Sequence, residues 1–272
     1  MTRDNTFESV VANALDFFDR STQELEEHPK YSLIHFCAAV ELFLKARLLL
    51  EHWSLVFAKP ETADWGKFCK GDFVSVGLQD AQKRLKAIIG EPLSDDEYKS
   101  FERLVEHRNR LVHFHLAGDS SKESLVERVA AEQLVAWCHL HTLLTRRWRF
   151  HFSGNYLKLY QMELSMRRHR AYLDAKYHVV GARIDAEERE GCQYGECPAC
   201  GFHSARPDQK TGELHRRYCL VCDWYSHELE IECPECTETV VFHGEGHGSC
   251  DKCGMSFDPK RLVDIYTDEG AE

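Results

Sequence analysis

The sequence lacks a long uninterrupted apolar segment, a secretory leader and any low-complexity stretch. Its most apolar part, residues 31–50, is interrupted by Glu41, Lys45 and Arg47, whereas a helix that crosses a bilayer needs about 20 mostly apolar residues. Since no signal peptide follows Met1, we expect the cysteines to remain in a reducing compartment. The sequence therefore predicts a soluble cytoplasmic protein with no membrane partner.

Basic side chains are scarce in the last third of the chain. Residues 192–272 contain 16 acidic and 7 basic side chains, so this segment carries −9 of the net charge of −11. A general nucleic-acid clamp needs lysine and arginine to neutralise phosphates, which argues against that role and against a DNA-binding regulator. A protein partner or a structural role fits the acidic segment better.

The same segment is rich in cysteine and contains four Cys-x-x-Cys pairs. A gap of 18 residues separates the first pair from the second, and a gap of 13 residues separates the third pair from the fourth. Two such turns, about 10 to 20 residues apart, bring four thiolates around one ion. The spacing predicts two structural Zn²⁺ ions in tandem zinc ribbons, whose closed four-sulfur sites leave no open position for catalysis. The expected ligands are Cys197, Cys200, Cys219, Cys222, Cys233, Cys236, Cys250 and Cys253.

The order in which these pairs combine is not determined by spacing. We expect pairing in sequence order, although an interleaved arrangement of first with third and second with fourth has the same spacing. A disulfide framework is disfavoured because such frameworks belong to secreted chains. Nearby side chains can also replace a ligand, but we expect them to be ordinary loop residues because the paired cysteines suffice. They are Cys192, His215, His227, His243 and His247.

Before Gly191 the apolar residues recur with helical periodicity almost throughout. We expect helices over residues 6–27, 31–55, 77–89, 94–114, 122–148 and 155–188, with a loop over residues 60–71. Gly90 is expected to end the third of these helices, and Ser94 is expected to cap the fourth. The fold class is therefore mainly α, with a helical domain over residues 1–150 and a helical extension and linker over 151–191. Residues 192–272 form a small β-rich domain of tandem zinc ribbons. The isolated Cys37, Cys69 and Cys138 are expected to be buried thiols.

One predicted helix carries polar groups on its apolar stripe. Arg108 lies on that stripe, where a guanidinium requires a cavity, a partner charge or a ligand. Asn109 and His113, four residues apart, lie on the adjoining face. A guanidinium can hold phosphate oxygens and an imidazole can transfer a proton near neutral pH, so the group suits phosphodiester chemistry.

Glu41, in the second predicted helix, has two possible roles. It lies on an apolar line of that helix, which makes it a candidate buried partner for Arg108. The alternative is an ion pair with Lys45, four residues later on the same helix.

Arg108, Asn109 and His113 resemble the signature of the HEPN family (higher eukaryotes and prokaryotes nucleotide-binding), in which four to six residues separate the arginine from the histidine. Residues 39–46 and 76–85 also look like that family, and the resemblance covers about residues 5–150. It implies a HEPN-like helical bundle that forms a homodimer with the two motifs facing each other. It also implies a metal-independent endoribonuclease that cuts RNA by 2′-hydroxyl attack and leaves a cyclic phosphate.

The resemblance assigns a role to each motif residue. Arg108 would stabilise the phosphorane, His113 would act as acid or base, and Asn109 would position the substrate or the histidine. His115 also satisfies the spacing and is the alternative to His113. It stands where HEPN toxins controlled by a nucleotidyltransferase carry a modified tyrosine, so that mode of control is not expected here.

The sequence thus predicts a HEPN-type endoribonuclease that acts on RNA as a toxin or antiviral defence effector. The alternative is a non-catalytic HEPN dimer, an adaptor whose acidic zinc ribbons bind a protein, or which binds nucleic acid. Two basic stretches with interleaved aromatic residues, 146–151 and 167–172, are candidates for gripping RNA. Their competing interpretation is a solvated helix face.

Overall fold

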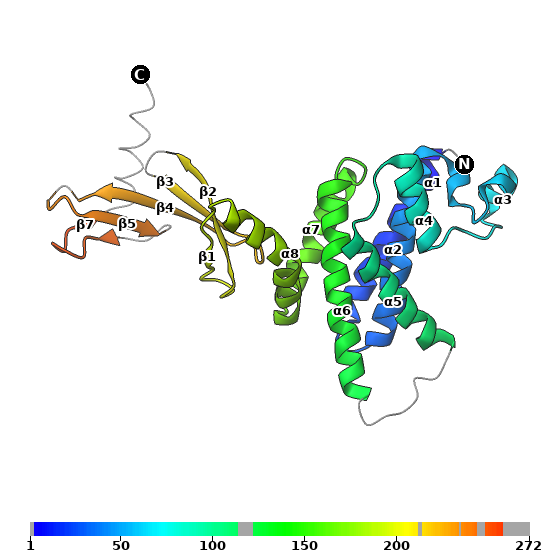
Figure 1. The fold of residues 1–272 in the computed structure, drawn as a ribbon, viewed down its shortest axis with the longest axis horizontal. Helices are drawn as coiled ribbons and strands as arrows, with labels where there is room; N and C mark the ends of the chain where they lie inside the picture. The colour runs from blue at the N-terminus through cyan, green and yellow to red at the C-terminus, as the bar shows by residue number, and fades with distance from the viewer. Residues whose placement is uncertain (1–2, 114–121, 212–213, 234, 244–247, 258–272) are drawn as a thin grey trace, which may run out of the picture. The chain divides into compact units, whose positions relative to one another are not determined.

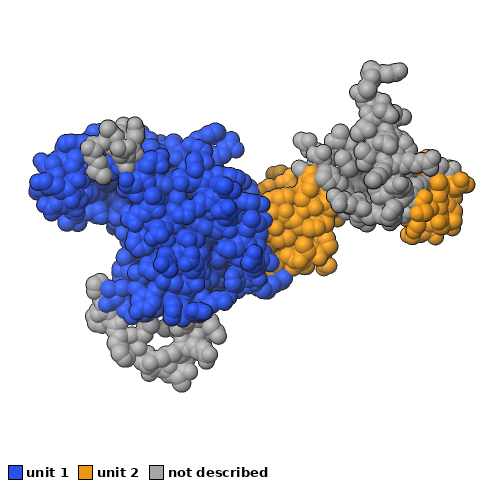
Figure 2. All heavy atoms as spheres, turned by 180° about the vertical axis from the view of Figure 1, so that it is seen from behind, with its two compact units in different colours: residues 1–176 blue, residues 177–272 orange. Residues whose placement is uncertain are grey.

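The structure, a computed structural model, describes residues 3–113, 122–211, 214–233, 235–243 and 248–257. The described chain is mainly helical, with a small C-terminal antiparallel sheet (Figure 1). It divides into two compact units, Met1–Lys176 (unit 1) and Tyr177–Glu272 (unit 2), coloured separately in Figure 2. None of the helices in the described part of the chain combines the length and the apolar character that crossing a bilayer requires.

Unit 1 is built around helix α2 (Pro29–Glu51). Helix α1 (Arg3–Gln23) packs along it, and α5 (Asp95–His113) and α6 (Lys122–Thr142) pack against its other sides (Figure 1). Twelve residues of α2 are buried, because neighbours cover it on more than one side. The centre of this core is aromatic: Phe18 contacts Phe36, Phe43 and Trp137 at ring-centroid distances of 5.1–6.1 Å.

The loop that we expected over residues 60–71 is partly helical. It contains a 3₁₀ turn, η2 (Pro60–Thr62), and helix α3 (Trp65–Lys70), while the helix expected over residues 31–55 ends at Glu51 and is followed by another 3₁₀ turn, η1 (Trp53–Val56). Asp64 caps α3 by accepting from the Lys67 amide at 2.8 Å, and Gly71 ends it in the left-handed conformation. Helix α4 (Leu78–Arg84) continues into the π-helical turn η3 (Leu85–Ile89), which ends at Gly90 as predicted.

Helix α5 begins with the capping interactions that its sequence predicts. The Glu97 amide donates to Ser94 Oγ at 3.2 Å, and the Ser94 amide donates to Glu97 Oε2 at 2.7 Å. The same Glu97 oxygen accepts a hydrogen bond of 2.6 Å from Arg147. Arg147 is the last residue of the π-helical turn η4 (Leu143–Arg147), which follows α6. The start of α5 is therefore fixed to the end of α6.

The region predicted as one helix over residues 155–188 is divided in two. A 3₁₀ turn, η5 (Ser153–Asn155), leads into α7 (Tyr156–Met166), and α8 (Arg170–Arg189) follows after a break at residues 167–169. No glycine or proline marks this break. Arg167 turns back toward α7, with Nη2 3.1 Å from Glu163 Oε2.

Unit 2 contains a five-stranded antiparallel sheet in the order β1-β2-β3-β4-β5, followed by a separate two-stranded ladder of β6 and β7. Ile184 of α8 is buried with Tyr194 and Leu220, beside the first two cysteine pairs. A second small core of Cys233, Val240 and Cys250 surrounds the last two pairs. The strands are β1 (Gly195–Glu196), β2 (His203–Thr211), β3 (Leu214–Cys219), β4 (Tyr225–Glu232), β5 (Thr239–His243), β6 (Gly248–Ser249) and β7 (Ser256–Phe257).

Candidate functional site

The eight paired cysteines form two separate groups of four. Within each group all Sγ atoms lie within 4.8 Å of one another, and the groups join the first pair with the second and the third with the fourth. This is the pairing in sequence order, not the interleaved arrangement. The shortest Sγ–Sγ distances between pairs are 3.5–3.6 Å, far longer than a disulfide bond of about 2.05 Å.

Each Cys-x-x-Cys pair is built by the same backbone turn. The residue after the second cysteine has a positive φ, between 56° and 74°, and its amide donates to the carbonyl oxygen of the first cysteine at 2.7–3.1 Å. The amide of the first cysteine donates to the carbonyl oxygen five residues later at 2.8–2.9 Å. These bonds hold both thiols of a pair together. The positive-φ residues are Gly201, Asp223, Thr237 and Gly254.

The donor sets fit a tetrahedral metal ion. Four sulfurs around an ion at about 2.3 Å would be separated by about 3.8 Å, close to the separations between pairs. Around Cys219, the amides of Val221 and Cys222 also point at Sγ from 3.4 Å, which favours a thiolate. Each of the two groups could therefore hold one metal ion.

The alternative ligands stay apart from these groups where the structure describes them. Cys192 packs against the apolar cluster of Ile184 and Tyr194 and is not a member of either group. His247 lies outside the described residues, as do the side chains of His215, His227 and His243.

Arg108 lies against α2 and pairs with Glu41. Its Nη2 atom is 3.1 Å from Glu41 Oε1, and each side chain is about a quarter exposed, 27% and 24%. Glu41 Oε2 also accepts from Lys45 Nζ at 3.4 Å, so both contacts considered from the sequence occur together. Burial raises the pKa of the neighbouring Cys37 thiol to about 12, with Arg108 opposing the rise and Glu41 adding to it.

One donor of Arg108 has no partner among the described residues. Its Nε atom is buried, and no described residue accepts a hydrogen bond from it. An unpaired buried donor costs about 1–3 kcal/mol. The rest of the guanidinium is oriented by one carboxylate and is partly exposed, an arrangement that is well suited to hold an anion.

The other motif residues lie further along α5. Asn109 is exposed, and His113 is the last residue of the helix, where the structure describes its backbone alone. His115 lies outside the described residues. The structure thus orients Arg108 through Glu41, while the roles of Asn109, His113 and His115 stay predictions.

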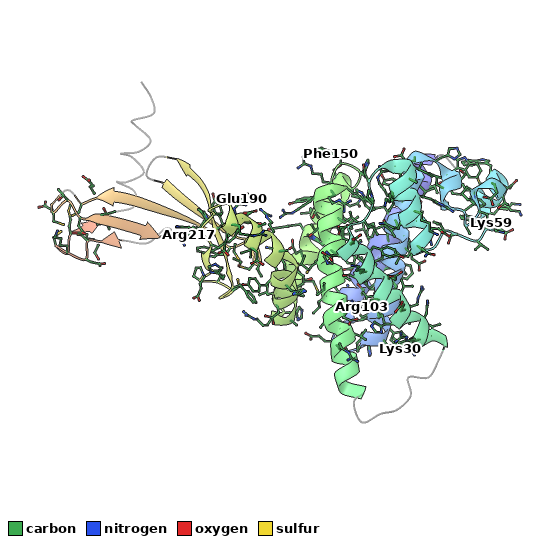
Figure 3. The ribbon with its side chains drawn as sticks, viewed as in Figure 1. Lys30, Lys59, Arg103, Phe150, Glu190 and Arg217 are labelled. Atoms are coloured by element: carbon green, nitrogen blue, oxygen red, sulfur yellow. The ribbon has the colours of Figure 1, made fainter. Side chains whose placement is uncertain are left out.

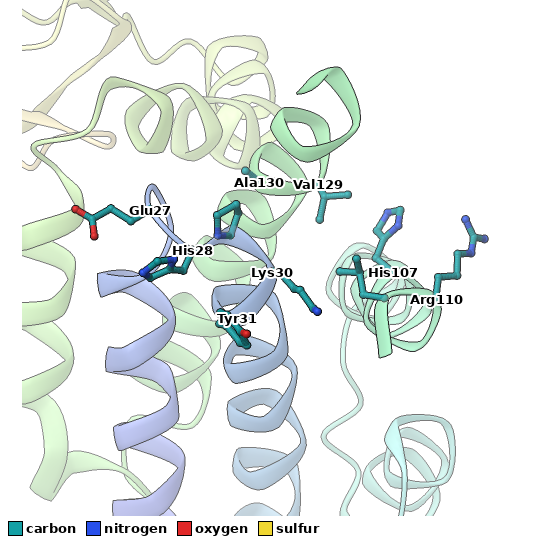
Figure 4. Close-up of a pocket in the computed structure, with 10 residues that line it drawn as sticks. Glu27, His28, Lys30, Tyr31, His107, Arg110, Val129 and Ala130 are labelled. Carbon is teal, nitrogen blue, oxygen red and sulfur yellow. The ribbon is translucent and has the colours of Figure 1, made fainter. Parts of the chain in front are cut away.

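A pocket that we did not predict lies beside the motif. It has a volume of about 410 Å³ and is lined by the turn that leads into α2, by α5 around His107 and Arg110, and by α6 around Val129 (Figure 4). His107 is held in place because its Nε2 atom lies 2.9 Å from Glu132 on α6. No spacing in the sequence links these three segments, which meet only through the packing of the helices.

Each of the two basic stretches loses one predicted stacking ring to the core of unit 1. Trp148 and Tyr172 are each 1% exposed, so neither can stack on a base. Arg147 pairs with Glu97, and Arg167 with the buried Glu163. Phe150 keeps an exposed ring: it is 77% exposed, and the Arg149 guanidinium lies 4.6 Å from its centre (Figure 3).

Glu163 is the centre of a buried polar cluster that joins α6, α7 and α8. Its Oε1 atom accepts from Lys176 at 2.5 Å and from the Tyr172 hydroxyl at 3.1 Å. Burial alone would raise the pKa of Glu163, but the surrounding His141, Lys176 and Arg167 hold it at about 2. Burial lowers the pKa of His141, and the nearby Glu163 carboxylate opposes that shift.

One buried-thiol prediction is wrong. Cys37 and Cys138 are buried, whereas Cys69 is exposed because the unexpected helix α3 places it on an outer face.

The comparisons with known proteins add no family. No protein-family model, no curated protein sequence and no solved structure matches this chain. The described geometry therefore establishes a mainly helical protein with a C-terminal antiparallel sheet and two four-cysteine groups, each of which could bind a metal ion.

Proposed function

We propose that unit 1 is a HEPN-type endoribonuclease domain and that the chain cleaves RNA without a catalytic metal. The observation that carries the proposal is the arrangement of Arg108: Glu41 holds one end of its guanidinium, while 27% of the side chain stays exposed. Such a group can bind a phosphodiester and the charge that develops on it.

The cleavage step follows from the motif residues. The 2′-hydroxyl oxygen attacks the adjacent phosphorus while one His113 imidazole takes the hydroxyl proton. A bond forms between phosphorus and O2′, and the bond from phosphorus to O5′ breaks. The leaving O5′ accepts a proton from a protonated imidazole. The products are a 2′,3′-cyclic phosphate and a 5′-hydroxyl, and Arg108 stabilises the phosphorane between them.

This step needs two imidazoles in different protonation states. One protomer supplies one His113, so we propose a homodimer in which the two α5 helices meet and each contributes a histidine. His115 is the alternative proton carrier. Asn109, which is exposed on α5, would contact the phosphate or orient the histidine.

We propose that both four-cysteine groups bind Zn²⁺ and that the ions are structural. Four thiols per group match the closed tetrahedral site that zinc prefers, and a closed site has no position for water or substrate. The acidic unit 2 would then serve as a stable surface for a protein partner.

A non-catalytic adaptor is the second candidate, favoured by one observation. Helix α7 exposes four large apolar side chains, Tyr156, Leu157, Tyr160 and Leu164. A contiguous exposed apolar face is typical of a binding surface and contributes nothing to RNA cleavage.

Cleavage of RNA by the purified full-length chain separates the two candidates. With mild chelator present, wild-type protein should cleave RNA, and Arg108→Ala and His113→Ala should each reduce the rate at least about 1000-fold while the far-UV circular dichroism is unchanged. Lys99→Ala, which removes an exposed cation from the same helix, should retain full activity. Absence of cleavage of any RNA would favour the adaptor.

The cellular role that we propose is that of a cytoplasmic toxin or antiviral defence effector. Growth arrest on expression that disappears with Arg108→Ala would support it. Growth arrest that persists in that variant would contradict it.

A further inference from the structure

The pocket beside the motif differs from the motif in position and in chemistry. His107, Arg110 and Leu111 line it from α5, whereas Arg108 faces Glu41 on α2. At 100° per residue, the pocket residues and the Asn109/His113 face lie on different sides of α5. The pocket is therefore a separate site on the same two turns of helix.

One wall of this pocket is apolar. Pro29 and Tyr31 line it from the start of α2, Leu111 from α5, and Val129 and Ala130 from α6. Tyr31 is 53% exposed, an unusual position for an aromatic ring that serves only the core. A volume of about 410 Å³ is in the range of pockets that bury small planar ligands.

The mouth of the pocket is cationic. Lys30 and Arg110 both line it, and Lys30 Nζ lies 5.8 Å from the centre of the Tyr31 ring. Figure 4 shows the Lys30 side chain extending toward the side where His107 and Arg110 lie, whereas the Glu27 carboxylate points the opposite way. Within the described part of the chain, Lys30 forms no ion pair, and Arg110 has only a distant one, 3.9 Å from Glu106.

We propose that this pocket binds one nucleotide unit of an RNA strand. The base packs on the apolar wall beside Tyr31, and the phosphate lies between Lys30 and Arg110. An aromatic ring with adjacent cations is the combination that recognises unstacked bases in single-stranded RNA. An acidic peptide would satisfy the cations but would leave the apolar wall without a planar partner.

The inference rests on the proposed function for its biological meaning, because the bound nucleotide would belong to the RNA strand that the motif cleaves. The pocket would then select a base of that strand away from the cleavage position. Its binding chemistry, however, can be measured without any cleavage.

The test is binding of the four ribonucleoside 5′-monophosphates to the full-length chain by isothermal titration calorimetry, with ribose 5-phosphate as the ligand without a base. At least one nucleotide should bind with one site per chain and at least about tenfold more tightly than ribose 5-phosphate, because the base adds a stacking contact. Equal affinity for ribose 5-phosphate would overturn the inference, since only a phosphate contact would remain.

Matched variants locate the site. Val129→Trp, which fills the pocket, should abolish nucleotide binding, and Lys30→Ala and Arg110→Ala should each weaken it about tenfold. Lys99→Ala removes an exposed cation from α5 outside the pocket and should bind like wild type. Nucleotide binding that is unchanged in Val129→Trp, or weakened equally by Lys99→Ala, would overturn the inference.

Failure of this inference and failure of the proposed function give different results. If Arg108→Ala binds nucleotide normally but neither the wild-type chain nor any variant cleaves RNA, the pocket inference stands and the ribonuclease proposal fails. If RNA is cleaved but no nucleotide binds above the ribose 5-phosphate level, the ribonuclease stands and the pocket inference fails. If both hold, Val129→Trp should cleave RNA with altered base preference.

Discussion

Glu41 makes both of the contacts that the sequence offered as alternatives. Because its two carboxylate oxygens face different directions, one holds Arg108 and the other Lys45. The apolar line on α2 was sufficient to name Glu41 as a candidate partner from sequence, but not to choose between Arg108 and Lys45. The buried, unpaired Nε of Arg108 could not be predicted, since it depends on how closely α5 packs against α2.

We predict that Glu41→Gln lowers kcat for RNA cleavage about tenfold with little change in KM, because the guanidinium loses the charge that orients it. The free energy of unfolding should fall by only about 1 kcal/mol, since the pair is partly solvent-exposed. Steady-state kinetics and urea unfolding measure the two quantities. Lys45→Ala is the control, and an equal loss of kcat in that variant would refute a positioning role for Glu41.

Glu163 should make unit 1 sensitive to acid. Its pKa of about 2 in the folded chain lies below its ordinary value of 4.5, so its stabilising contribution is present above pH 4.5 and is lost as the pH falls toward 2. The difference between these pKa values corresponds to about 3 kcal/mol. His141, whose pKa is also lowered, adds a loss of stability as the pH falls below its ordinary value of 6.5.

Urea unfolding followed by circular dichroism at several pH values tests this contribution. Glu163→Gln should be less stable than wild type at pH 7, and the difference should narrow as the pH falls from 4.5 to 3. The exposed Glu8→Gln should differ little from wild type throughout. A difference in the free energy of unfolding between Glu163→Gln and wild type that stays constant over this pH range would contradict the lowered pKa of Glu163.

At the scale of elements, local signals in the sequence explain which helix boundaries were predicted correctly. Such signals also border helix α3, which was missed. The cap at Ser94 and the stop at Gly90 were readable because each depends on neighbours within a few residues. Helix α3 also has a cap and a stop, Asp64 and Gly71, but its six residues are too few to show periodicity. The break between α7 and α8, at residues 167–169, has no glycine or proline to signal it.

The four Cys-x-x-Cys turns predict opposite effects of two substitutions. Thr237 has φ of 59°, a conformation that a β-branched residue rarely adopts, whereas Gly254 occupies the equivalent position at 74° without strain. Thr237→Gly should therefore stabilise the second cysteine group by about 1 kcal/mol, and Gly254→Val should destabilise it by at least as much. Metal release in a chelator titration measures both. Faster release from Thr237→Gly would contradict this interpretation of the turns.

At the scale of the whole molecule, the division into a helical part and a cysteine-rich sheet could be predicted because periodicity and cysteine spacing are strong signals. The aromatic residues within the basic stretches could not be assigned correctly. Their charged neighbours suggested a surface, yet Trp148 and Tyr172 fill the core of unit 1. The pocket at α5 was also missed, since it is formed by three segments that are distant in sequence.

Metal removal should act on unit 2 alone. The chain should release two Zn²⁺ ions per molecule, and strong chelation should abolish the sheet because the small cores of unit 2 are built around the cysteine groups. The helical signal at 222 nm should be largely retained, since α1 to α7 lie in unit 1. Zinc analysis and circular dichroism measure both. Release of one ion, or loss of most of the helical signal, would contradict the two-unit account.

The chemical nature of the RNA ends that the full-length chain produces in mild chelator tests the central claim most directly. If Arg108 and His113 promote 2′-hydroxyl attack, the products carry 2′,3′-cyclic phosphate and 5′-hydroxyl ends, and none form with Arg108→Ala. Products with 5′-phosphate ends, or cleavage that persists in Arg108→Ala, would contradict the claim.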